Sequence, residues 1–227
     1  SLKNNMKLVT LNIWGARVNQ PFLDYINKSK DIDIFCFQEL YHDAGRVMKD
    51  LYPENDFNIV SKIDNLLIEH KYYFRPSIGD VYGIGVYLKK GIEVLEEGAI
   101  MIHPNRSNDG EIDGHHERNL QWVNIKHKDG VVTIINVHGL WNGKGKTDTQ
   151  DRIDQSNRIK DFMKSISNPI ILCGDFNLLP DTESLRIISE GLIDHVKINN
   201  ISSTRTSYYK KDVKFADYIF TSPEIKV

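Results

Sequence analysis

The stretch Asn168-Pro-Ile-Ile-Leu-Cys-Gly-Asp-Phe-Asn-Leu-Leu-Pro180 decides the fold of this chain. Its apolar run from Ile170 to Cys173 is short and is followed directly by glycine, which is the pattern of a buried strand that ends at a turn. The turn presents a carboxylate, Asp175, and a carboxamide, Asn177, at the carboxyl end of the strand. Open α/β sheets build their sites at such ends. Asp and Asn are also common turn formers, so this turn alone does not define a site.

The bulk properties predict an ordinary globular protein with one domain over residues 1–227. The chain has 227 residues, 40% of them hydrophobic and 26% charged, and a formal net charge of -2. No apolar run approaches a membrane-spanning length, and the first residues lack the apolar centre of a secretory signal. Cys36 and Cys173 lie in apolar runs and are interpreted as buried free thiols. We therefore expect a cytoplasmic monomer without a transmembrane segment.

The pattern along the chain predicts more strands than helices. Strands are predicted at 7–13, 32–37, 57–60, 72–74, 84–88, 92–96, 120–126, 131–138, 170–173 and 215–220, and helices at 22–28, 47–51, 149–164 and 184–189. The helix at 149–164 is amphipathic, with Ile153, Ile159, Phe162 and Met163 on its apolar side. Many strands form adjacent hairpin-like pairs, which favours an α/β (α+β) fold of mixed sheets with helices outside.

Polar side chains stand at the ends of several predicted strands. They are Asn12, Glu39, His138, the pair Asp175 and Asn177, and Asp217. A polar group there costs free energy unless it is paired or functional. Each one alone could be a cap or a turn residue, but their repetition at strand ends predicts one shared site.

These residue types suit metal-assisted cleavage of a phosphodiester or a phosphomonoester. Glu39 is a hard oxygen ligand for Mg²⁺ or Mn²⁺, and Mg²⁺ needs few carboxylates. Asp175 would orient or deprotonate the attacking water. Asn12, Asn177 and His138 would donate hydrogen bonds to the negatively charged transition state.

The residues carry a resemblance to a known family. The matching motifs, in order, are Thr10–Asn12, Gln38–Glu39, Asn136–His138, Gly174–Asn177 and Asp217–Tyr218. With these motifs the chain resembles the endonuclease/exonuclease/phosphatase superfamily, whose members are similar to pancreatic deoxyribonuclease. The stretch Ser203–Thr206, which leads to Phe215–Phe220, resembles the short bacterial members of this superfamily. The resemblance implies a four-layer sandwich of two mixed β-sheets flanked by helices. It also implies a phosphate-ester substrate, with nucleic acid, lipid and inositol phosphates among the candidates.

Two departures from the family pattern bear on function. Members of the family end with a Ser-Asp-His motif, whose His contacts the scissile phosphate and is oriented by the acid that matches Asp217. The sequence ends at Val227, before such a motif, so we expect the domain to lack its C-terminal strand and this motif here. A protein ending there would be very weakly active, and the alternative is a catalytically degenerate binding module of the same fold. Trp14 stands where apurinic endonucleases carry Asp, which disfavours abasic-site repair.

The glycine-rich segment from Gly139 to Thr147 follows a strand and precedes a helix, as a phosphate-binding loop does. That motif needs four residues between its first Gly and the Gly-Lys-Thr, whereas Gly139 leaves five and Leu140 occupies the required Gly position. A P-loop nucleotide hydrolase is therefore disfavoured. The segment is interpreted as a basic loop that either contacts substrate through Lys144 or Lys146 or is simply solvated.

Three other polar features were weighed as binding groups. Arg152, near the start of the following helix, could approach a phosphate, although an exposed ion pair is the simpler reading. Arg205 lies in a polar loop before the last strand and is a candidate for binding an anionic substrate. His115 and His116 have no matching ligand pair at zinc spacing and are expected in a surface loop.

Overall fold

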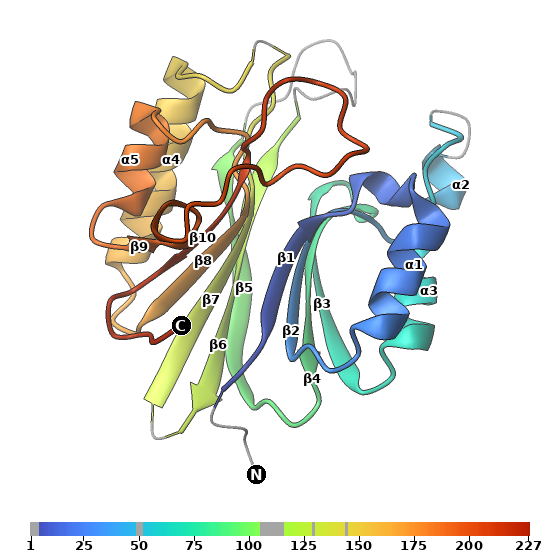
Figure 1. The fold of residues 1–227 in the computed structure, drawn as a ribbon. Helices are drawn as coiled ribbons and strands as arrows, with labels where there is room; N and C mark the ends of the chain where they lie inside the picture. The colour runs from blue at the N-terminus through green and yellow to red at the C-terminus, as the bar shows by residue number, and fades with distance from the viewer. Residues whose placement is uncertain (1–4, 49–51, 105–115, 129, 144) are drawn as a thin grey trace.

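The computed structural model describes residues 5–48, 52–104, 116–128, 130–143 and 145–227. Two β-sheets face each other, and helices cover the outer face of each (Figure 1). The layers are therefore helix, sheet, sheet and helix. This architecture confirms the predicted fold class.

The first sheet is built from the first 89 residues, in the order β1-β2-β4-β3. Its strands are β1 (Leu8–Asn12), β2 (Ile34–Tyr41), β3 (His70–Ile78) and β4 (Tyr82–Lys89). The pair β1–β2 is parallel and the other pairs are antiparallel, so the sheet is mixed. The helices on this side are α1 (Asn19–Lys28), α2 (Gly45–Met48) and α3 (Ile59–Leu66), and the short 3-10 helix η1 (Trp14–Ala16) follows β1.

The second sheet has the order β5-β6-β7-β8-β10-β9. Its strands are β5 (Val94–His103), β6 (Arg118–His127), β7 (Gly130–His138), β8 (Ile170–Asp175), β9 (Ile193–Asp194) and β10 (Asp217–Thr221). Only β7–β8 pair in parallel among these described strands. The helices are α4 (Gln150–Lys164), α5 (Glu183–Ser189) and α6 (His195–Ile198). Thr149 caps α4 by accepting from the backbone N–H of Arg152.

Three apolar clusters fill the spaces between the layers. One joins the first sheet to α1 and α3 and another joins the second sheet to α4 and α5. The third lies between the sheets and contains both Cys36 and Cys173, which are buried and free, as predicted. Burial of these clusters is the main force that holds the four layers together.

The structure corrects three local predictions. The strand predicted at 57–60 is wrong, because Ile59 and Val60 begin α3, whose buried residues also include Ile63. That helical spacing is apparent only when the whole of 59–66 is considered. The helix predicted at 47–51 begins earlier, at Gly45, and residues 49–51 lie outside the described residues. In α4, Ile159, Phe162 and Met163 pack into the second apolar cluster as predicted, but the polar residues Arg152, Gln155 and Ser156 are also fully buried, which the prediction did not include.

A bulge in β2 separates two neighbouring polar residues. The pairing of β2 with β4 shifts between Phe37 and Leu40, and Glu39 has a φ of 58°. Gln38 is fully buried, and its amide nitrogen donates to Asn136 Oδ1 of the second sheet at 2.8 Å. The amide nitrogen of Asn136 donates back to the carbonyl oxygen of Phe37 at 3.1 Å. These bonds fix how the two sheets sit on each other.

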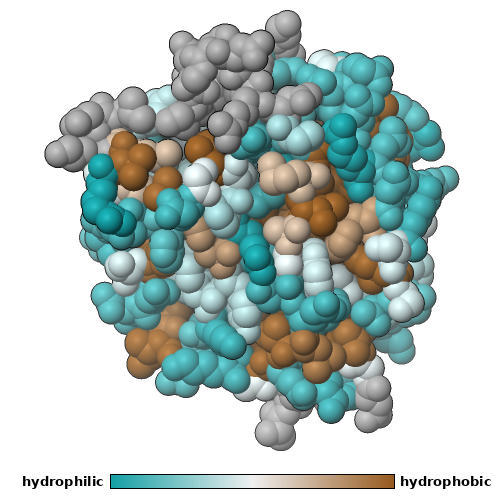
Figure 2. Space-filling model, turned by 180° about the vertical axis from the view of Figure 1, so that it is seen from behind, coloured by the Kyte–Doolittle hydropathy of each residue, from teal (hydrophilic) through white to brown (hydrophobic). Residues whose placement is uncertain are grey.

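The face seen in Figure 2 carries hydrophobic residues in several separate patches among hydrophilic ones. Such scattering is normal for the surface of a folded protein. Within the described part of the chain, the structure has no helix with the length and hydrophobicity needed to cross a membrane.

Candidate active site

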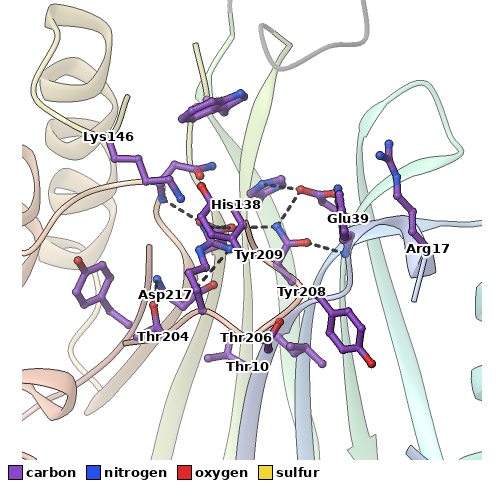
Figure 3. Close-up of a pocket in the computed structure, with 18 of the residues that line it drawn as sticks. Thr10, Arg17, Glu39, His138, Lys146, Thr204, Thr206, Tyr208, Tyr209 and Asp217 are labelled. Atoms are coloured by element: carbon purple, nitrogen blue, oxygen red, sulfur yellow. Dashed lines mark hydrogen bonds and ion pairs between the residues drawn. The ribbon is translucent and has the colours of Figure 1, made fainter. Parts of the chain in front are cut away.

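A pocket of about 550 Å³ opens where the ends of strands from both sheets meet. All six predicted catalytic residues line it: Asn12, Glu39, His138, Asp175, Asn177 and Asp217. Figure 3 shows Glu39 on one side of the pocket, Asp217 and Lys146 on the other, and His138 between them. Residues that are far apart in the sequence thus share one cavity.

Strand register explains why these residues meet. In the second sheet, Asp175 at the end of β8 pairs with His138 at the end of β7 and with Asp217 at the start of β10. In the first sheet, Asn12 at the end of β1 pairs with Gln38, next to Glu39. Each sheet therefore contributes one row of polar residues, and sheet packing places the two rows face to face.

Asn12 connects the two rows. Its amide nitrogen donates to Glu39 Oε1 and to Asp175 Oδ2, each at 2.9 Å. Its Oδ1 accepts from the backbone N–H of Trp14 at 2.8 Å, which fixes the orientation of the amide. One carboxamide thus holds two carboxylates from different sheets beside each other, and hydrogen bonds to charged groups are the stronger kind.

The turn after β8 depends on a glycine. Gly174 has a φ of 145°, and a Cβ there would lie 2.0 Å from the carbonyl oxygen of Val137. Only glycine allows β7 and β8 to approach this closely while the chain turns. Asn177, at a φ of 53°, donates from its backbone N–H to Asp175 Oδ1 at 2.9 Å and from its side chain to the carbonyl oxygen of Gly139 at 3.0 Å. The turn therefore holds the Asp175 carboxylate in place.

His138 is buried beside a cation. The Arg118 guanidinium lies 2.9 Å from its Nδ1, and its Nε2 lies 3.7 Å from Glu39 Oε1. Burial, followed by the charge of Arg118, holds the pKa of His138 well below its usual value. Burial also raises the pKa of Glu39, which the hydrogen bond from Asn12 partly opposes. The imidazole is therefore neutral near pH 7, with one ring N–H to donate.

Arg205 bridges two carboxylates of the second sheet. Its guanidinium lies 3.5 Å from Asp175 Oδ2 and 3.8 Å from Asp217 Oδ2. Burial and the neighbouring charge of Asp175 raise the pKa of Asp217 to about 7, although Arg205 acts in the opposite direction. Asp217 thus titrates near neutral pH, as groups in active sites often do.

The other predicted binding residues are placed differently. Lys144 lies outside the described residues, but Lys146 of the same loop is buried in the pocket wall. Arg152 does not reach the pocket. It is fully buried, and its guanidinium donates to the carbonyl oxygens of Thr147 at 2.8 Å and Gly145 at 2.7 Å. Arg152 therefore supports the loop that carries Lys146.

Several pocket residues were missed by the sequence analysis. They are Arg17, Tyr41, Tyr82, Arg118, Trp141 and Tyr209. His116 also lines the pocket and is buried, in contrast to the surface loop expected for it, and burial lowers its pKa to about 3. The sequence did contain a signal for Arg118. It is a charged residue at the start of a mostly apolar strand, and a charge buried there is costly unless it is paired.

The donor set fits a hard divalent cation. Glu39 and Asp175 offer carboxylate oxygens and Asn12 a carboxamide oxygen, all within the pocket. The described residues contain no group of three or more His, Cys, Asp or Glu that could hold a metal. Mg²⁺ does not require one, because it is commonly bound by one or two carboxylates and keeps several waters. The residues present are thus compatible with Mg²⁺ held through Glu39.

The fold and the pocket define the class of protein. A four-layer sandwich whose facing sheets join Asn, Glu, His and Asp side chains in one cavity is the arrangement that the family resemblance of the sequence predicts. The chain belongs to the Endonuclease/Exonuclease/phosphatase family, whose sequence pattern matches residues 9–227. No curated protein matches the chain in sequence.

Solved structures share the fold at low sequence identity. A mannosyl-6-phosphatase of Bacteroides thetaiotaomicron is 18% identical with a TM-score of 0.68, over 97% of this chain and 86% of that one. A functionally unknown protein of Enterococcus faecalis is 16% identical with a TM-score of 0.69, over 96% and 87%. TDP2 of D. rerio, solved with a single-strand DNA product, is 16% identical with a TM-score of 0.65, over 96% and 83%. At these identities the likeness shows the fold alone.

Proposed function

We propose that this chain hydrolyses phosphodiester or phosphomonoester bonds, with Mg²⁺ or Mn²⁺ as its cofactor. One observation carries the proposal: the Asn12 amide donates at 2.9 Å to a carboxylate of each sheet, Glu39 and Asp175. A buried carboxylate, Asp175, and a partly buried one, Glu39, held side by side in a pocket are costly for stability, so a functional reason for keeping them is needed.

The residues divide the work of the reaction. Asp175 lies 2.9 Å from two donors, the Asn12 amide and the Asn177 backbone N–H, which hold its carboxylate in place to orient or deprotonate water. The neutral His138 donates its N–H to a phosphoryl oxygen. Arg118, next to it, adds positive charge where negative charge develops in the transition state.

Three further residues tune the site. Asp217 and Arg205 balance the charge around Asp175, and Asn177 holds the turn that carries it. Glu39 is the residue that would hold the metal ion. When bound there, Mg²⁺ or Mn²⁺ supplies Lewis-acid polarisation of a phosphoryl oxygen and stabilises the leaving oxygen.

The substrate class follows from the family and from the pocket. Among proteins of the same fold are a mannosyl-6-phosphatase and TDP2 solved with a DNA product, so sugar phosphates and nucleic acid are both candidates for this chain. We also expect a cytoplasmic monomer, in keeping with its buried free thiols. Size-exclusion chromatography with light scattering checks the monomer.

The test is hydrolysis of bis(p-nitrophenyl) phosphate and p-nitrophenyl phosphate with Mg²⁺ or Mn²⁺. Glu39→Gln and Asp175→Asn should each lower kcat by about 10²-fold or more, since each removes a charge that acts in the transition state. Asp181→Asn, an exposed carboxylate elsewhere, is the matched control and should keep the wild-type rate. Full rates in both pocket variants would show that the roles are wrong. No hydrolysis by the wild type with either metal would refute the proposed function.

A further inference from the structure

One wall of the pocket alternates positive charges and aromatic rings. We define the cationic wall as Trp141, Lys146, Arg205 and Tyr209, which line the pocket, together with Lys211, which contacts the Trp141 ring but does not itself line the pocket. The Lys146 ammonium lies 5.9 Å from the centre of the Trp141 ring and 5.5 Å from that of Tyr209. Arg205 lies 4.8 Å from the Tyr209 ring, and Lys211 lies 5.2 Å from the Trp141 ring. Two rings therefore separate and hold three cations, each in cation–π geometry.

Lys146 lacks a charge partner of its own. Only 3% of the residue is exposed, yet within the described part of the chain its ammonium makes no hydrogen bond and no ion pair. Burial lowers the pKa of Lys146 to about 8, although the charges of Asp175 and Asp217 act in the opposite direction. An anion beside the ammonium would offset the cost of this burial.

The neighbouring cations are engaged differently. The Arg205 guanidinium already faces Asp175 and Asp217, so much of its charge is balanced within the protein. Lys146 is on the Asp217 side of the pocket, away from Glu39 (Figure 3). Lys211 is exposed at the outer end of the wall. The Lys146 ammonium, which makes no ion pair with a described residue, therefore lies beside the catalytic residues and on the far side of the pocket from Glu39 (Figure 3).

The backbone that carries Lys146 is held rigidly. Its carbonyl oxygen accepts from the backbone N–H of Leu179 at 2.9 Å. The buried Arg152 guanidinium binds the carbonyl oxygens of the residues on either side, Gly145 and Thr147. A cation positioned before the ligand arrives loses little entropy on binding, which is how a preformed binding site gains affinity.

We propose that the cationic wall binds a second anionic group of the substrate, so that the protein acts on molecules that carry two neighbouring phosphates. The inference rests on the proposed function, because it names the substrate class of the same pocket. The scissile phosphate lies against Asn12 and His138, and the second phosphate lies against Lys146, in the cavity of about 550 Å³ that both line. A small bisphosphate and a short oligonucleotide offer the same chemistry.

The first experiment measures binding without catalysis. Inorganic phosphate and inorganic pyrophosphate are titrated calorimetrically into the protein in EDTA. Wild type should bind pyrophosphate at least about tenfold more tightly than phosphate, because a charge-assisted contact to Lys146 is gained. Lys146→Met should reduce this ratio to less than about threefold, whereas Lys146→Arg should keep most of it. Lys164→Met removes an exposed lysine of α4 and should leave the ratio unchanged.

An unchanged ratio in a folded Lys146→Met protein would overturn the proposal, as would a wild-type ratio near one. Thermal denaturation establishes that each variant is folded, and Tyr209→Leu, which removes a ring beside Lys146, gives an independent second variant with a reduced ratio. If the ratio depends on Lys146 while no phosphoester is hydrolysed, the binding site stands and the proposed hydrolase function fails. If esters are hydrolysed and the ratio of the two affinities is the same in Lys146→Met as in wild type, the proposed hydrolase function is supported and this inference fails.

The second experiment separates the two sources of the second phosphate. The kcat/KM of wild type and Lys146→Met is compared on a hexose bisphosphate against a hexose monophosphate, and on a dinucleotide with and without a 5′-phosphate. A loss of at least about tenfold confined to the sugar pair assigns the wall to small bisphosphates, and a loss confined to the dinucleotide pair assigns it to nucleic acid. Equal losses on the one-phosphate and two-phosphate members of both pairs would count against a second-phosphate site.

Discussion

Replacement of Asn12 by leucine should destabilise the protein in a manner that depends on pH. Leucine has nearly the same shape but cannot donate to Glu39 and Asp175, each of which now accepts from the Asn12 amide at 2.9 Å. Hydrogen bonds to charged groups contribute about 1.5–3 kcal/mol each, so we expect a loss of about 3 kcal/mol at pH 7 after the gain from the apolar side chain.

The sign of the pH dependence follows from Glu39. Burial already raises its pKa above the ordinary 4.5, and the Asn12 amide opposes that rise. Without the amide the pKa in the folded state rises further, so the variant loses stability relative to wild type as pH increases through the raised folded-state pKa of wild-type Glu39, which lies above 4.5. At pH 4 Glu39 is protonated in both proteins, and the loss should shrink by about 1 kcal/mol.

Urea denaturation followed by tryptophan fluorescence, in EDTA at pH 4 and pH 7, measures both values. Asn119→Leu is the matched control. Asn119 is also buried, but it donates to two neutral carbonyl oxygens, those of Arg75 at 3.0 Å and Pro76 at 3.1 Å. Its replacement should cost the same at both pH values. An Asn12→Leu loss that is equal at the two pH values, or larger at pH 4, would refute this account of the paired carboxylates.

Three further predictions concern other residues of the site. Asp217→Asn should leave stability unchanged near pH 4 and raise it by up to about 3 kcal/mol at pH 8. The pKa of Asp217 is raised to about 7 in the folded protein, so ionisation of this carboxyl destabilises the folded state above the unfolded-state pKa. Thermal melts at the two pH values check this, and a lower melting temperature of the variant at pH 8 contradicts it. Gly174→Ala should lower the stability by more than about 3 kcal/mol, since its Cβ would lie 2.0 Å from the Val137 carbonyl oxygen. Gly191→Ala should lower it by only about 1 kcal/mol, because Gly191 has a φ of 80° but open space around it. Comparable melting temperatures of the two variants would contradict this prediction. Arg152→Met should raise KM more than it lowers kcat, because it removes the hydrogen bonds that hold the loop carrying Lys146. Steady-state kinetics measure both constants. An unchanged KM in the folded variant would show that the loop does not need this support.

The sequence predicted the six catalytic candidates because each belongs to a short local motif at a strand end. Strand register then brings such ends together without further information, as with Asp175 and its neighbours His138 and Asp217. The layered fold was predictable for the same reason, since adjacent strand pairs and amphipathic helices leave few ways of packing.

The walls of the pocket were not predictable from local pattern. Tyr82 and Arg118 stand at the starts of β4 and β6, and they reach the pocket only because the two sheets pack face to face. Arg152 was expected either to approach a phosphate or to form an exposed ion pair, and the structure shows neither. Its burial depends on carbonyl oxygens of the preceding loop that face inward, which a periodicity analysis does not detect. The helix at Ile59 was missed because a four-residue apolar window cannot distinguish a strand from the first turn of a helix.

The division of the sheets along the chain has a practical consequence. All strands of the first sheet lie within residues 8–89 and all described strands of the second within residues 94–221, so the short turn between Lys89 and Val94 is the natural place to cut the gene in two. Neither half would contain all residues of the candidate active site, because Asn12 and Glu39 would be on one piece and His138 and Asp175 on the other. Turnover regained on mixing the halves would therefore report their reassembly, and the protein could serve as a split reporter.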